Sequence, residues 1–97
     1  MHAFKLSMTA GAACSAAPPG ATISGMCLVN DDDASLARDA ALLALNSLGF
    51  ESCTFLDVAK LPASPDLSRY NDAMRQAYED ARREGVAVML YGPDAAG

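Results

Sequence analysis

The first 30 residues contain only one charged side chain of the Lys, Arg, Asp and Glu set, that of Lys5. Residues 4–10 alternate between apolar and polar side chains, which is the period of a half-buried strand. Residues 21–30 alternate in the same way, with Ile23, Cys27 and Val29 on one face. Gly and Pro interrupt the chain between these runs, in residues 11–20. The pattern predicts two paired strands joined by a flexible loop.

A helix and a third strand are expected next. The run Asp31–Asp33 predicts a helix N-terminus, because short acidic side chains cap free backbone N–H groups and favour the positive end of the helix dipole. Gly49 predicts the end of this helix, since glycine readily adopts the left-handed conformation found there. Residues 50–58 then predict a strand.

The last third of the sequence predicts a second helix and a fourth strand. Ser64 followed by Pro65 is typical of a helix start, and the helix is expected to run to Glu84 and stop at Gly85. Residues 86–91 form an unbroken apolar run. Because strands buried on both faces show such runs, we expect this strand to be central in the sheet.

These elements predict one α+β domain over residues 1–97, with 11–20 as a flexible loop and 93–97 as a tail. The expected architecture is a two-layer sandwich in ββαβαβ order. It has a four-stranded mixed sheet with two helices on one face.

The net charge of −5 and the isoelectric point near 4.5 argue against two classes of partner. Nucleic-acid-binding proteins usually carry a basic surface, and membrane-surface proteins use Lys and Arg. We therefore expect neither a nucleic acid nor a membrane as partner.

The three cysteines, Cys14, Cys27 and Cys53, are odd in number and form no CxxC pair. This argues against a disulfide framework and a zinc site, and it favours a reduced, cytoplasmic protein. The alternative is that residues 1–17 are a processed export signal. Against it, Ser7 and Thr9 interrupt the apolar run.

No catalytic residue, metal ligand or cofactor site is predicted, and whether the chain is an enzyme stays open. The only histidine, His2, lies next to the first residue, where a side chain is rarely held. Asp31–Asp33 lack the spacing of a calcium loop. The candidate for chemistry is Cys14, as a reactive thiol exposed in the 11–20 loop.

The first helix predicts a partner surface. On a helical wheel of residues 35–48, Leu42 lies within the polar arc and Leu45 lies at its edge. Exposed leucines of this kind would contact a partner subunit. Because Lys5 alone guards the first two strands against pairing with other chains, either these strands are interior in the sheet or their edge pairs with a second copy. Together with the leucines of the first helix, this predicts a homo-oligomer.

Three stretches of the sequence resemble a group of small bacterial α+β proteins of unknown function. They are GATISGMCLVN (20–30), SLARDAALLALNSLGFE (35–51) and YNDAMRQAYEDARREGVAVMLYGP (70–93). The sequence departs from the pattern where Gly49–Phe50 replaces an expected Gly-Trp. The resemblance implies a bacterial origin and transfers no activity and no site residue.

Two functions follow as hypotheses. The first is a non-enzymatic, oligomeric protein-interaction module. The second is a small-molecule-binding protein or enzyme whose site lies at the 11–20 loop or at a subunit interface.

Overall fold

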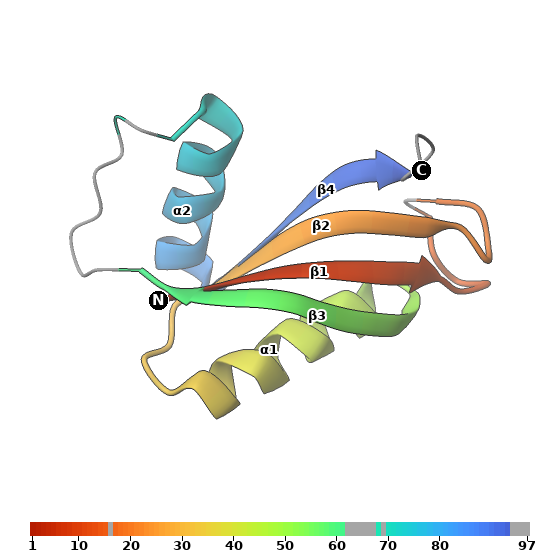
Figure 1. Cartoon of the computed structure of the whole chain (residues 1–97), viewed down its shortest axis with the longest axis horizontal. Helices are drawn as coiled ribbons and strands as arrows, with labels where there is room; N and C mark the ends of the chain where they lie inside the picture. Colours follow the sequence, from red (N-terminus) through yellow and green to blue (C-terminus); the bar gives the residue numbers. More distant parts are fainter. Residues whose placement is uncertain (16, 62–67, 69, 94–97) are drawn as a thin grey trace.

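The computed structural model describes residues 1–15, 17–61, 68 and 70–93. Within them the element order ββαβαβ is confirmed (Figure 1). The third strand runs two residues beyond its predicted end, and residues 94–97 of the expected tail lie outside the described residues. The elements are β1 (His2–Ala10), β2 (Thr22–Val29), α1 (Ala34–Ser47), β3 (Phe50–Lys60), α2 (Asp72–Glu84) and β4 (Val86–Pro93).

The sheet has the strand order β3-β1-β2-β4, and every neighbouring pair is antiparallel. The prediction of a mixed sheet is therefore wrong. β2 and β3 both run antiparallel to β1, so they point the same way, but β1 lies between them. The prediction that β4 is central is also wrong, since β4 lies at one edge.

The two faces of the sheet carry different helices. On one face Phe4, Leu6 and Cys27 form a core with Ala37, Ala41 and Leu45 of α1. On the other face Ala3 and Leu28, next to Phe4 and Cys27 in the chain, pack against Ala77, Tyr78 and Ala81 of α2. Since successive strand residues point to opposite faces, α1 and α2 cover opposite faces.

The prediction that both helices lie on one face is consequently wrong. In Figure 1, β3 passes in front of α1, whereas α2 stands on the near side of the sheet. The physical reason lies in the second apolar set of the central strands. Ala3, Met26 and Leu28 point away from α1, and α2 buries them.

Side chains cap both helices at their first turns. The Asp33 carboxylate accepts hydrogen bonds from the backbone N–H groups of Ser35 and Leu36, at 2.9 and 3.1 Å, which confirms the predicted cap of α1. α2 is capped by Asn71, whose side chain accepts from the N–H of Met74 at 2.8 Å. The predicted start at Ser64 lies outside the described residues, and the described helix begins at Asp72.

The loop after β1 packs against the end of α1. Gly49 has a φ of +96°, as predicted for a helix-ending glycine. Its carbonyl accepts a hydrogen bond from the N–H of Gly11 at 2.9 Å. A Cβ atom at Gly49 would lie 2.5 Å from Cα and 2.6 Å from N of Cys14. Gly49 therefore provides both a left-handed backbone and the space in which the loop docks.

This double role predicts that Gly49→Ala destabilises the protein far more than Gly85→Ala. Gly85 has the same φ of +96°, but nothing lies within 4 Å of a Cβ there. Gly85→Ala should therefore lower the free energy of unfolding by about 1–2 kcal/mol, the cost of left-handed backbone. Gly49→Ala adds a clash with backbone atoms, so its loss should be about twice as large or more. Urea unfolding of both variants measures the difference, and equal losses would show that the loop does not pack on Gly49.

Candidate interaction surface

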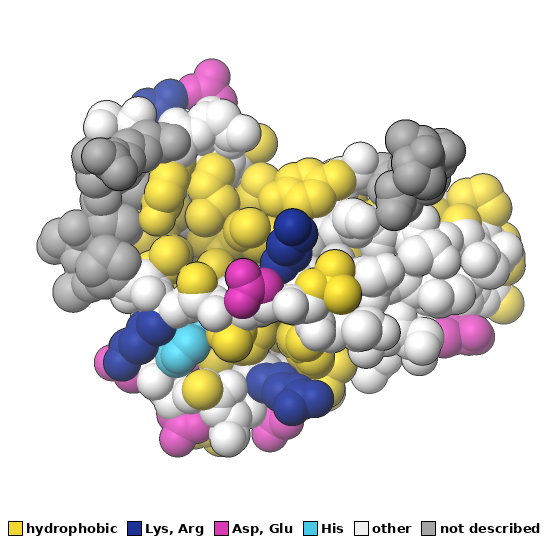
Figure 2. Space-filling view, viewed as in Figure 1, with side chains coloured by type: hydrophobic (Ala, Val, Ile, Leu, Met, Phe, Trp, Pro, Cys, Tyr) yellow, Lys and Arg dark blue, Asp and Glu magenta, His cyan; other side chains and the backbone are white. Residues whose placement is uncertain are grey.

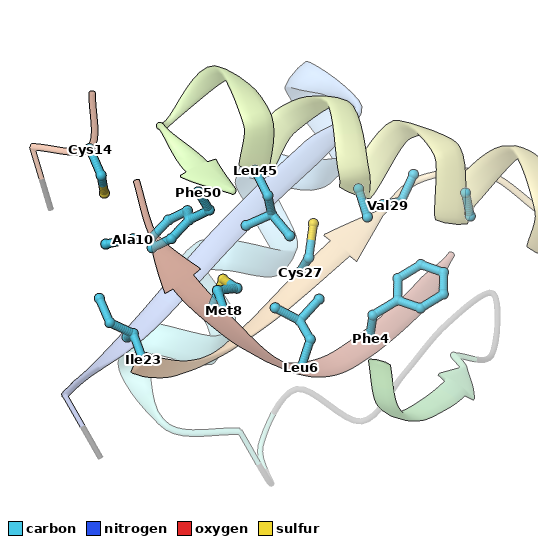
Figure 3. Packing of buried hydrophobic residues seen from close by; sticks show 12 residues of the cluster. Phe4, Leu6, Met8, Ala10, Cys14, Ile23, Cys27, Val29, Leu45 and Phe50 are labelled. Carbon is cyan, nitrogen blue, oxygen red and sulfur yellow. The ribbon is translucent and has the colours of Figure 1, made fainter. Parts of the chain in front are cut away.

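The residues that the sequence singled out lie mostly in the core. Leu45 has no exposed surface, so the prediction that it contacts a partner is wrong. It points from α1 toward Cys27 and Phe50 (Figure 3). Leu42 is partly buried, and its role as a partner contact stays a prediction. The hypothesis for Leu45 failed because small residues, Ala37 and Ala41, set the stripe of α1 that faces the sheet.

Cys14 is buried, with 8% of its surface exposed, at the end of the cluster near Ala10 and Phe50 (Figure 3). The exposure required for a reactive loop thiol is therefore missing. His2 cannot assist this thiol, because His2 lies at the start of β1 and Cys14 follows its other end. The sequence missed this burial, since nothing in residues 11–20 signals that Gly49 makes room for the loop.

His2 is held by the fold although it lies next to the first residue. It is 5% exposed, and its ring Nδ1 lies 2.8 Å from the carbonyl oxygen of Asp31. Because a carbonyl only accepts, Nδ1 carries the proton and donates this hydrogen bond. The bond ties the start of β1 to the turn before α1, which is a structural role.

The acidic run 31–33 is used for local hydrogen bonds. The Asp31 carboxylate accepts from the N–H of Asp33 at 2.9 Å, and Asp33 caps α1. Within the described part of the chain, no group of three or more His, Cys, Asp or Glu side chains is placed to hold a metal ion.

Three exposed leucines instead lie on α1 or at its C-terminal end. Leu36, Leu43 and Leu48 are 57%, 71% and 42% exposed. Leu48 and Ser47 line a groove together with β4. Leu43 precedes Ser47 by four residues and follows Leu36 by seven, so Leu36, Leu43 and Ser47 share one stripe of the helix. Leu48, the C-cap residue, lies about a third of a turn from that stripe.

β4 presents an open row of backbone groups. The N–H of Asn30 donates to the carbonyl of Gly85 at 2.8 Å, so this opposing pair is hydrogen-bonded. Bonded and non-bonded pairs alternate along antiparallel strands, so Ala87 and Met89 also bond to β2. Val86, Val88 and Leu90 then direct their N–H and C=O groups to the free edge, where no described strand pairs with them.

A groove of about 580 Å³ runs along this edge. Its floor is formed by β4 from Val86 to Met89. The α1 wall and the α2 wall are lined mainly by small or polar side chains, and the α2 wall includes the acidic residues Asp80 and Glu84. The wall residues are Ala44, Ser47 and Leu48 of α1, and Ala73, Gln76, Ala77, Asp80 and Glu84 of α2.

The opposite edge of the sheet carries charges that β4 lacks, although the pairing of β4 with β2 also shifts register once. β3 contains Glu51, Asp57 and Lys60, and its pairing with β1 shifts register twice. Charges and bulges of this kind discourage pairing with another strand. β4 reads VAVMLYGP and contains no charged residue.

A second cavity of about 490 Å³ lies beside β3. The Arg38 guanidinium stacks over the Phe55 ring, 4.9 Å from its centre. Phe4 meets Phe55 edge to face on the same side of the sheet. This cavity combines an aromatic surface with a cation.

The face that carries α2 is only partly covered by that helix. In Figure 2, apolar side chains gather beside and beneath α2, and mostly uncharged polar and backbone atoms cover the far half of the strands. By the strand registers this open half contains Ser7, Thr9, Thr22, Ser24, Ser52 and Thr54. Such small hydroxyl side chains are compatible with water, so this half of the sheet needs no cover.

None of the helices in the described residues is long and apolar enough to cross a membrane. Comparison with protein-family models, with curated proteins and with solved structures finds no match to this chain. The predicted resemblance to small bacterial proteins therefore stays a prediction, and the geometry of the surface carries the functional argument.

The core cysteines predict a loss of stability at high pH. Burial, and next the nearby Cys53, raise the pKa of Cys27 from 9.0 to about 12, and burial raises the pKa of Cys53. Above pH 9 the unfolded chain releases these protons while the folded chain retains them. The free energy of unfolding should therefore fall between pH 9 and pH 12, with Cys27 contributing up to about 1.4 kcal/mol per pH unit.

Cys27→Ala tests this effect. The variant should be less stable at pH 8, because it leaves a small cavity, but its stability should fall less steeply above pH 9. Urea unfolding at several pH values gives both slopes. Parallel slopes for wild type and variant would show that Cys27 titrates normally.

Proposed function

We propose that the chain is a non-enzymatic, oligomeric protein-interaction module that accepts an extended protein segment along β4. The single observation that carries the proposal is the free edge of β4 at the floor of a groove. There Val86, Val88 and Leu90 direct backbone groups outward from a strand with no charge, and no strand of the described residues lies beside them.

Strand addition fits this arrangement. When a segment joins a sheet edge, main-chain hydrogen bonds supply affinity, and pockets for alternate side chains supply specificity. Alternate side chains of a segment on β4 would point to the α1 wall, near Ala44 and Leu48, and to the α2 wall, near Ala73 and Ala77. The α1 wall is small or apolar, whereas the α2 wall combines two alanines with Gln76, Asp80 and Glu84. The groove therefore favours a segment whose apolar side chains alternate and point to the α1 wall.

The alternative function, small-molecule binding, has support from one observation. The cavity beside β3 places the Arg38 guanidinium over the Phe55 ring, where a planar or anionic group could contact both. The 11–20 loop offers less support for this alternative, because Cys14 packs into the core there.

Selection of peptides from a displayed random library tests the proposed function. Peptides that bind the wild-type chain should be extended, with apolar residues at alternate positions. Their affinity should fall at least tenfold for Val88→Pro, since proline removes one outward N–H group from β4.

Val88→Pro should remain folded, because proline is tolerated on edge strands where its nitrogen faces solvent. The matched control is Val58→Pro on β3, the other edge strand. If circular dichroism shows that this variant is folded, it should bind the selected peptides as wild type does. If selected peptides bind wild type and Val88→Pro equally well, β4 is not their site.

A further inference from the structure

We infer that the segment that pairs with β4 is amphipathic, with apolar side chains toward α1 and Lys or Arg side chains toward α2. This inference rests on the proposed function and specifies the chemistry of the partner. It follows from the charges of the groove. Among the described residues that line the groove, the charged ones are Asp80 and Glu84, both acidic and both on α2.

The two faces of β4 determine which wall each partner side chain meets. Val86 and Val88 pack against the core cluster that includes α1, and Ala87 and Met89 pack against the cluster that includes α2. Side chains directly opposite one another in paired strands lie on the same face of the sheet. Partner residues opposite Val86 and Val88 therefore point to the α1 wall, and those opposite Ala87 and Met89 point to the α2 wall.

The stripe of α2 that lines the groove is acidic, and the arginines of this helix lie elsewhere. The residues of the stripe recur at helical spacing, and they are Ala73, Gln76, Ala77, Asp80 and Glu84. At about 100° per residue, Arg75 and Arg82 lie nearly half a turn from the middle of this stripe. Arg82 and Arg83 line a separate hollow with Glu79. The groove therefore meets the negative side of a helix that carries both signs of charge.

Glu84 is the main charge that the partner meets. It is exposed, and no described residue forms an ion pair with it. Asp80 contributes less, because its carboxylate lies 2.7 Å from the Arg83 guanidinium. Since α2 ends at Glu84 and β4 begins at Val86, this charge lies at the Val86 end of the groove. The C-terminal end of a helix also carries partial negative charge, so a cation is favoured there and a carboxylate is repelled.

Lys and Arg fit the α2 wall better than an apolar side chain does. Their aliphatic stems can cover Ala73 and Ala77 while the charged group reaches the acidic residues and water. An apolar side chain would cover the carboxylates with hydrocarbon and give them no partner, which costs free energy. The net charge of −5 also attracts a basic segment to the protein.

Binding of four synthetic peptides, measured by fluorescence anisotropy, tests the inference. Three of them alternate Val with Lys, with Gln or with Glu, and the fourth has the β4 sequence VAVMLY, which represents a second copy. At low salt the Lys peptide should bind about fivefold more tightly than the Gln peptide. The Glu peptide should bind more weakly than the Gln peptide, and the β4 peptide no more tightly. The preference for Lys should shrink as salt screens the charges.

Glu84→Gln and its matched control Glu79→Gln separate the groove from the net charge. Each variant removes one negative charge from α2, but Glu84 lines the groove and Glu79 lines the separate hollow. Glu84→Gln should reduce the preference for the Lys peptide to about twofold or less, whereas Glu79→Gln should keep it. A preference that both variants reduce equally overturns the inference, since net charge then explains it.

The same measurements separate the inference from the proposed function. If the Gln, Glu or β4 peptide binds at least as tightly as the Lys peptide, the inference is overturned. The proposed function then stands as long as Val88→Pro weakens the binding of that peptide. If no peptide binds wild type, or if Val88→Pro leaves the binding unchanged, the inference and the proposed function are both overturned.

Discussion

The pairing of β1 with strands on both of its sides is the constraint on which the rest of the structure depends. Its register with β2 and β3 determines which face each side chain meets. Phe4, Leu6 and Met8 point to one face, and Ala3 points to the other. Because both faces contain apolar residues at the end near α2, neither face can be left to water there, and the chain uses one helix for each. In this arrangement β3 and β4 form the two outer edges of the sheet.

The elements themselves could be predicted because their signals are local. Alternation defined β1 and β2, and the caps at Asp33 and Gly85 marked the helix ends. The arrangement of these elements could not be predicted in the same way. Hydropathy reports whether the faces of a strand are covered, not whether another strand lies beside it. Val86 and Val88 of β4 pack against the core cluster that includes α1, and Ala87 and Met89 pack against the cluster that includes α2, so this edge strand is covered on both faces. A strand whose two faces are covered in this way shows the same continuous apolar run as a central strand.

Of the two leucines of α1 that the sequence predicted as partner contacts, Leu45 lies in the core, and Leu42 stays a prediction. The helical wheel placed Leu45 at the edge of the polar arc, whereas in the structure Leu45 lies in the core with Ala37 and Ala41. Ala37 and Ala41 let the backbone approach the sheet closely, and Leu36 and Leu43 lie outside. A wheel centred on the alanine spacing of four residues would have placed the exposed leucines correctly.

The two edges of the sheet differ in a way that supports the interaction proposal. An unpaired edge is a hazard for aggregation, and proteins usually protect it with charge, irregularity or cover. Here β3 has charged residues and two register shifts, whereas β4 has no charged residue and lies in an open groove. The pairing of β4 with β2 also shifts register once and β4 ends at Pro93, so the difference between the two edges is charge. An uncharged edge in a groove is the better site for a partner strand.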